Sequence, residues 1–181
     1  MSNQTIANIY AANGNIHAKL KETITKLNDE QLAFLPEGEK WTILHIVEHI
    51  AIVKDGMSRI SAKLLAQAQA AGKQSNGEAV LTENFAKKAA EAKQLKFEAP
   101  DRVRPTGNLT IAESLAKMEE SEAALEKLRP LFETVECSDY KFPHPFMGEL
   151  SAHEWLALVG GHEARHLAQI ERIVAGMQKT E

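Results

Sequence analysis

Apolar residues recur every three or four positions along four long stretches of the chain, which is the spacing of one face of an α-helix. These stretches cover residues 4–27, 42–70, 110–130 and 151–177. The third is expected to stop near Pro130, because proline cannot continue the hydrogen bonds of a helix. No strand pattern competes with the four helices. The hydrophobic pattern therefore predicts an all-α protein.

Three of the four helices have a recognisable first residue. Thr42, Thr110 and Ser151 are the expected N-caps, because a hydroxyl there can accept a hydrogen bond from the backbone of the first turn. Thr110 and Ser151 are each followed three residues later by glutamate, which completes a capping box. Thr42 is followed at that distance by His45, which we expect to weaken the cap.

The connection between the second and third helices is unusually long. Residues 72–108 hold a short amphipathic stretch at 82–95 and the segment FEAPDRVRPTGN, whose prolines and glycine are typical of a connector. A long crossover lets the third helix run parallel to the second. A further helical turn is expected at 29–34. The similar lengths of the long helices favour a four-helix bundle with this crossover, as one domain over residues 1–181.

Composition narrows the class of protein. Acidic and basic residues are interspersed, the net charge is -4 and no basic stripe is present, so nucleic acid is not an expected partner. No signal segment and no uncharged run of about 20 residues is present, so we expect a cytoplasmic chain with no membrane partner. The single cysteine, Cys137, excludes an internal disulfide and is interpreted as structural.

Two pairs among the seven histidines have the i,i+4 spacing of one helix face, namely His45 with His49 and His162 with His166. The spacing alone is weak evidence, but both histidines of the last helix share the side of its aliphatic residues. His49 lies on the inward stripe of the second helix and could join them from across the bundle. A metal would take one nitrogen from each ring, and three protein ligands would leave an open coordination position.

The alternative interpretation is a set of hydrogen-bonded polar residues along a water-filled groove. The remaining polar candidates are weaker. Arg165 could attract an anionic substrate, and Tyr10 and Asn13 could line a pocket from the first helix. Three further histidines are interpreted as structural or solvent-facing, namely His17, His144 and His153. The helix that carries His17 shows no titratable partner for it.

The segments KWTILHIVEHIAIVKD (40–55) and GELSAHEWLALVGGHEARHLAQIERI (148–173) resemble the DinB-like, or YfiT-like, superfamily of metal-dependent four-helix bundles. That family has a Trp-Ser/Thr pair opening its second helix, a histidine eight residues after the tryptophan, and a His-x3-His pair followed by Gln-Ile. The matching residues here are Trp41, Thr42, His49, His162, His166, Gln169 and Ile170.

The resemblance implies that His49, His162 and His166 bind a divalent metal, most commonly zinc or nickel, with iron or manganese as alternatives. Relatives often have glutamate four residues before the first ligand, where this chain has His45. His45 is therefore a further candidate, either as a substitute ligand or as a residue that supports one.

The resemblance also implies a function, a thiol-dependent S-transferase that joins bacillithiol, mycothiol or a related low-molecular-weight thiol to a small-molecule electrophile, as a homodimer. One alternative is a metal-dependent hydrolase, for which Glu48 and Glu163 adjoin the ligands but point about 100° away from them. Another is a non-catalytic bundle that binds a metal or small ligand in a stress response. No catalytic residue is identified from the sequence.

Overall fold

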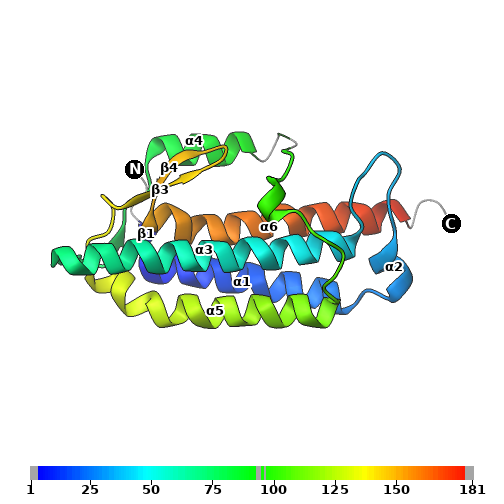
Figure 1. The fold of residues 1–181 in the computed structure, drawn as a ribbon, viewed down its shortest axis with the longest axis horizontal. Helices are drawn as coiled ribbons and strands as arrows, with labels where there is room; N and C mark the ends of the chain where they lie inside the picture. The colour runs from blue at the N-terminus through cyan, green and yellow to red at the C-terminus, as the bar shows by residue number, and fades with distance from the viewer. Residues whose placement is uncertain (1–3, 93–94, 96, 178–181) are drawn as a thin grey trace.

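The computed structural model describes residues 4–92, 95 and 97–177. Four long helices lie side by side, and α6 packs against both α1 and α3 while α5 packs against α3 (Figure 1). They are α1 (Ile6–Thr25), α3 (Ile43–Ala71), α5 (Ile111–Thr134) and α6 (Ala152–Met177). The predicted all-α class is confirmed. None of the described helices is long and apolar enough to cross a membrane.

The expected N-caps are present. Thr110 and Glu113 form a reciprocal capping box, and the backbone N–H of Ser151 donates to Oε2 of Glu154 at 2.9 Å. At the start of α3, His45 takes the place of glutamate. The Thr42 N–H donates to Nδ1 of His45, and the His45 N–H donates to Oγ1 of Thr42, both at 3.3 Å. The box is closed, so the structure does not show the weakened cap that the sequence suggested.

The expected end of the third helix is wrong. α5 continues through Pro130 to Thr134. The proline removes one backbone hydrogen bond, but the last turn carries Phe132 into the core with no exposed surface. The Val135 N–H also donates to the carbonyl of Leu131 at 2.9 Å and closes that turn. Burial of the aromatic ring thus outweighs the local cost of the proline.

The expectation that no strands form is also wrong. β1 (Gln4–Thr5) pairs antiparallel with β2 (Glu78–Ala79), and β3 (Lys141–His144) pairs antiparallel with β4 (Gly148–Ser151). These ladders are too short to give a clear alternation of apolar and polar residues. In the β3–β4 hairpin, Gly148 has φ of 77°, a backbone conformation that favours glycine.

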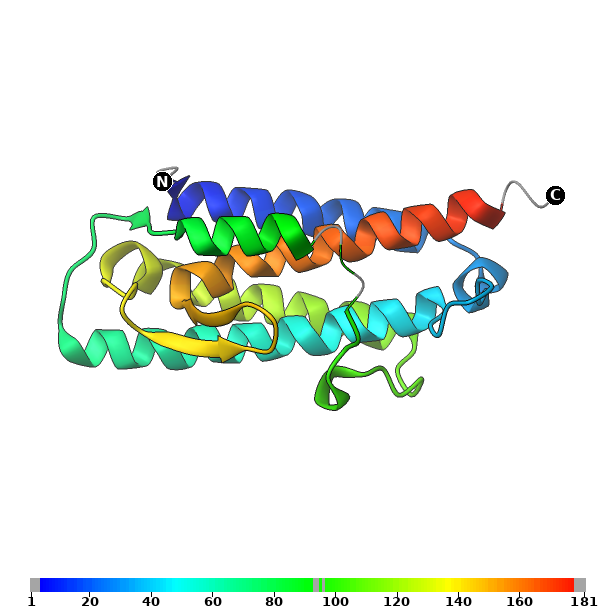
Figure 2. The ribbon, with the colours of Figure 1, turned by 90° about the horizontal axis from the view of Figure 1, so that it is seen from above.

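Smaller elements cover one side of the long helices. The shorter helices are α2 (Asp29–Ala33), α4 (Glu83–Ala92) and the 3-10 helix η1 (Asp101–Val103), and the first two match the short helical stretches expected from the sequence. α4 and the β3–β4 hairpin lie above α6 in Figure 1, and η1 lies beside α3 (Figures 1 and 2). The long connection thus folds back over the two helices that carry the candidate histidines.

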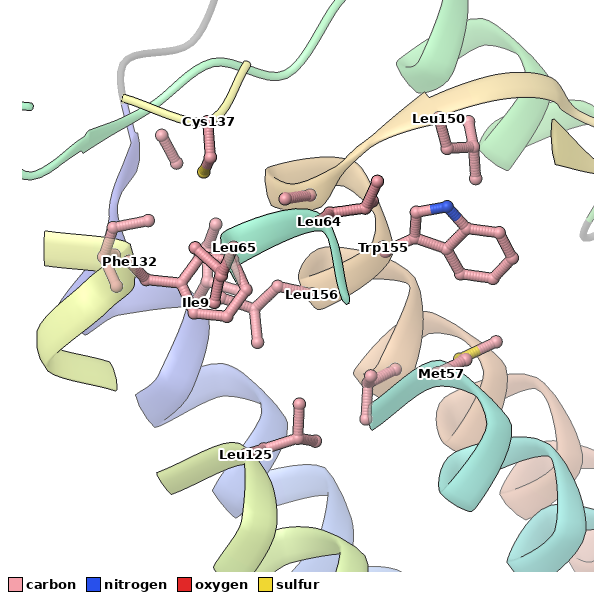
Figure 3. Close-up of a cluster of buried hydrophobic side chains, with 14 of the residues drawn as sticks. Ile9, Met57, Leu64, Leu65, Leu125, Phe132, Cys137, Leu150, Trp155 and Leu156 are labelled. Carbon is pink, nitrogen blue, oxygen red and sulfur yellow. The ribbon is translucent and has the colours of Figure 1, made fainter. Parts of the chain in front are cut away.

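The interior contains two apolar clusters. One lies toward the hairpin and includes Ile9, Leu64, Phe132 and Leu156 (Figure 3). The other includes Leu20, Ile46, Met118 and Ile170. Along α1, α3 and α6, buried polar residues lie between the two clusters; they include His17, Lys54 and Glu163.

Candidate metal centre

α3 and α6 bring three of the predicted site residues together. One ring nitrogen from each of His49, His162 and His166 lies within 4.8 Å of the others. The ring centroid of His49 lies 5.1 Å from that of His162 and 5.0 Å from that of His166. The ring centroids of His162 and His166 are 4.5 Å apart. Three imidazoles in this arrangement could hold a metal ion.

Hydrogen bonds fix the orientation of two of these rings. Nδ1 of His49 lies 2.7 Å from the carbonyl oxygen of Val103, and Nδ1 of His166 lies 2.9 Å from Oε1 of Gln169. Because both oxygens accept, each Nδ1 carries the proton and each Nε2 keeps its lone pair. The ring of His162 has no hydrogen bond to any described residue. The cluster therefore presents unprotonated nitrogens, the form that a metal requires.

Electrostatics also favour uncharged imidazoles. Burial lowers the pKa of His49, an effect that the hydrogen bond to Val103 partly opposes. Burial, then the charges of His166 and His49, hold the pKa of His162 well below its ordinary value. Burial and His49 lower the pKa of His166 to about 3. All three rings are thus neutral near pH 7 in the absence of a cation.

The three histidines open onto a cavity of about 2200 Å³ between the long helices and the elements that cover them. Part of its wall is aromatic. It includes both tryptophans of the chain, and the ring centroid of Trp41 lies 5.0 Å from that of His49. Its apolar lining includes Phe34, Trp41, Leu95, Phe97, Phe146 and Trp155.

Glu48 anchors the long connection beside the site. Its carboxylate accepts hydrogen bonds from the N–H and Oγ1 of Thr106, at 3.0 and 2.7 Å, and from the N–H of Gly107 at 2.7 Å. Although burial alone would raise the pKa of Glu48, these hydrogen bonds hold it below its usual range. Gly107, with φ of 75°, lies close to Nε2 of His45. Glu48 thus holds the connection, His45 lies beside it, and neither residue belongs to the histidine cluster.

Two further cavity residues have roles that the sequence did not reveal. Arg165 donates to the carbonyl oxygens of Ala92 and Leu95 and lies over the ring of Phe97, so it holds the connection after α4 against α6. His144, interpreted from the sequence as structural or solvent-facing, lines the cavity from the end of β3. Burial and the charge of Arg102 lower the pKa of His144 to about 4.

Two candidates on α1 do not reach the cavity. The hydroxyl of Tyr10 donates to the carbonyl oxygen of Leu125 at 2.7 Å, and Nδ2 of Asn13 donates to that of Leu156 at 2.9 Å. Both side chains are buried between helices. The expectation that they line a pocket is wrong, because each is committed to a backbone carbonyl of a neighbouring helix.

His17 has titratable partners from other helices, which the pattern of its own helix could not reveal. Its Nδ1 lies 3.2 Å from Oε1 of Glu163 and 3.1 Å from Nζ of Lys54. Lys54 also contacts Glu163 at 3.0 Å and Glu122 at 2.6 Å. Glu163 therefore belongs to a buried ionic network and is not free to act as a base beside His162.

Cys137 is buried, as a structural cysteine should be. Its Sγ lies 3.2 Å from Nε2 of His153, and Nδ1 of His153 accepts a hydrogen bond from the N–H of Val80 at 3.2 Å. Burial and the charge of Glu136 raise the pKa of Cys137 to about 12. A thiol in this environment stays protonated and is a poor nucleophile.

Comparison with known proteins found one sequence family that covers most of the chain. A sequence model of the DinB superfamily matches residues 16–170. An uncharacterized protein of Bacillus subtilis (strain 168), YuaE, is 26% identical over 151 residues, which cover 81% of this chain and 85% of YuaE. No solved structure matches the chain.

Proposed function

Because the chain belongs to the DinB superfamily, we propose that it is a metal-dependent enzyme in which His49, His162 and His166 hold a divalent cation. The observation that carries this proposal is the approach of three imidazole nitrogens to within 4.8 Å of one another at the wall of a cavity. We take the four long helices, with their long link between α3 and α5, as one four-helix-bundle domain of this family.

The chemistry of the donors supports a cation. All three rings are neutral, two of them are oriented by acceptors on Nδ1, and that of His162 has no other described partner. Borderline cations such as zinc and nickel prefer imidazole nitrogen, and iron and manganese also accept it. Three protein ligands are typical of catalytic sites, because they leave a position for substrate.

We infer that the reaction is the transfer of a low-molecular-weight thiol to an electrophile. A bound cation would supply Lewis acidity that lowers the pKa of a thiol. Pockets for one small molecule usually measure about 300–1,000 Å³, so a cavity of about 2200 Å³ has room for two substrates. The residues that line the cavity would orient both substrates. Val103 holds the ring of His49 and Gln169 holds that of His166.

Hydrolysis is the second candidate function, and the contacts of Glu48 and Glu163 make it the weaker one. Activation of water by a metal works best with a nearby base. Glu48 accepts three hydrogen bonds from the connection, and Glu163 is paired with Lys54. Neither glutamate next to a ligand in the sequence is available for that role.

A turnover screen separates these functions. Untagged protein loaded in turn with zinc, nickel, iron or manganese is mixed with monochlorobimane and with cysteine, glutathione, coenzyme A, bacillithiol or mycothiol. We expect conjugation with at least one thiol, its loss in His166→Ala and its retention in His45→Ala. Cleavage of nitrophenyl esters without a thiol would favour a hydrolase. Inactivity in both assays with metal bound would favour a binding protein.

A further inference from the structure

His144 offers the cavity a hydrogen-bond donor of fixed position. Its Nδ1 accepts from the backbone N–H groups of Phe146 and Met147, both at 3.2 Å. Because an amide N–H can only donate, the proton of the neutral ring is on Nε2. That Nε2–H has no hydrogen-bond partner among the described residues. The β3–β4 hairpin therefore holds a donor at the cavity wall, with the ring centroid 5.4 Å from that of Trp155.

Arg102 adds a positive charge at the same place. It lies close enough to His144 to contribute to the low pKa of that ring, and it lines the cavity. It makes no ion pair with a described carboxylate. Arg59, which also lines the cavity, is by contrast paired with Asp55 at 3.1 Å.

Two further arginines add positive charge elsewhere along the wall of the cavity. Arg165 donates its hydrogen bonds to carbonyl oxygens, and Arg172 has no carboxylate partner among the described residues. Both line the cavity, and they lie close enough together for Arg172 to lower the pKa of Arg165. An anionic group would find uncompensated positive charge beside the histidines.

Exposed apolar side chains line the same cavity. Five large hydrophobic side chains are strongly exposed among the described residues, and three of them line this cavity, namely Phe34 at 38%, Leu95 at 53% and Phe146 at 45%. The ring centroids of Phe146 and Phe97 are 4.7 Å apart, and Arg165 lies over the ring of Phe97. Exposed apolar surface gathered around a cavity is typical of a ligand site.

We propose that the cavity takes an organic anion with an aromatic or otherwise apolar body, whose anionic group is received by His144 and Arg102 and whose body lies against Phe97 and Phe146. This inference rests on the proposed function and names the class of its electrophilic substrate. His144 and Arg102 are then specificity residues, since they favour an anion over a neutral molecule of the same shape.

The test compares an anion with its neutral counterpart on metal-free protein, so that a carboxylate cannot bind through a metal. Calorimetry measures the affinity of 3,5-dinitrobenzoate and of 3,5-dinitrobenzyl alcohol. Quenching of Trp41 and Trp155, which both line the cavity, shows whether the probe is bound there. We expect the acid to bind at least about tenfold more tightly than the alcohol, the size of one hydrogen bond to a charged group.

Matched variants locate the effect. His144→Asn keeps an acceptor, Oδ1, for the N–H groups of Phe146 and Met147 but removes the Nε2–H donor. We expect His144→Asn and Arg102→Gln each to weaken binding of the acid by about fivefold to tenfold and to leave the alcohol unaffected. Arg59→Gln removes a paired cavity arginine and should change neither affinity. Circular dichroism checks that each variant is folded.

Equal affinities for acid and alcohol, or equal effects of Arg102→Gln and Arg59→Gln, would overturn the inference. Loss of both affinities in His144→Asn would do so too, because His144 would then only support the hairpin. These results are independent of metal binding. A protein that binds the acid selectively but retains no metal would refute the proposed function and leave this inference intact.

Discussion

Nδ1 of His49 donates a 2.7 Å hydrogen bond to the carbonyl oxygen of Val103, a residue of η1 in the long connection between α3 and α5. Glu48, the residue before His49, holds the same connection through Thr106 and Gly107. Two adjacent residues of α3 therefore bind one loop, and that loop fixes the ring of a candidate ligand. Replacement of a group that orients a metal ligand typically lowers metal affinity by about 10–100-fold.

Substitution of Glu48 should therefore weaken metal binding without touching the metal. In Glu48→Gln an amide N–H₂ faces one of the loop donors, so the Val103 carbonyl is held less firmly. We expect the dissociation constant for zinc to rise about tenfold, measured by competition with a chelator. Glu113→Gln, the same change in the capping box at the start of α5, serves as the control and should leave the zinc affinity unchanged. Unchanged zinc affinity in Glu48→Gln would contradict this role.

Gly160 lets α1 and α6 approach closely. A Cβ at this position would lie 3.2 Å from Cα of Asn13 and closer still to its side chain, whereas nothing lies within 4 Å of a Cβ at Gly161. We expect Gly160→Ala to lower the free energy of unfolding by about 1–3 kcal/mol. Gly161→Ala should raise it by about 0.5–1 kcal/mol, because alanine is the better helix former. Urea denaturation measures both, and equal effects would refute the close contact.

Breaking the buried ion pair of Lys54 with Glu163 should lower the free energy of unfolding strongly. Both side chains are almost fully buried, and the Lys54→Met variant would leave the Glu163 carboxylate without its cation. Removing one partner of such a pair typically costs about 3–5 kcal/mol. Lys26→Met, which breaks an exposed pair with Glu22, should leave stability almost unchanged. Similar unfolding curves for the two variants would show that the network contributes little.

The metal-free protein should lose stability as the pH falls. Burial and His49 lower the pKa of His166 from an ordinary 6.5 to about 3. Between these values the unfolded chain binds a proton that the folded chain does not, so acid favours unfolding. At about pH 4.5 this one group should cost up to about 3 kcal/mol relative to pH 7. Denaturation with a chelator present should therefore depend less on pH in His166→Gln, and an equal dependence would contradict the lowered pKa.

Much of the helical framework could be predicted from the sequence, because its signals are local. Thr42, Thr110 and Ser151 each lie within three residues of the group that closes the cap. The phase of His162 and His166 on α6, with the inward position of His49 on α3, allowed the three rings to meet, and the resemblance to a known family identified them as one set.

The remaining features depend on contacts between segments far apart in the sequence. The partners of His17 come from α3 and α6, so its own helix contains no sign of them. His144 reaches the cavity only because the hairpin folds over α6, and Glu48 meets Thr106 across 58 residues. Pro130 was misleading because burial of Phe132 decides the end of α5.

The most direct measurement is the metal content of untagged protein after loading and exhaustive dialysis, in the wild type and in two histidine variants of α3. Mass spectrometry should find about one divalent ion per chain in the wild type and in His45→Ala, and almost none in His49→Ala. His45 and His49 are one turn apart, so the pair controls for the loss of a histidine from this helix. An ion retained by His49→Ala, or none bound by the wild type, would contradict a centre built on His49, His162 and His166.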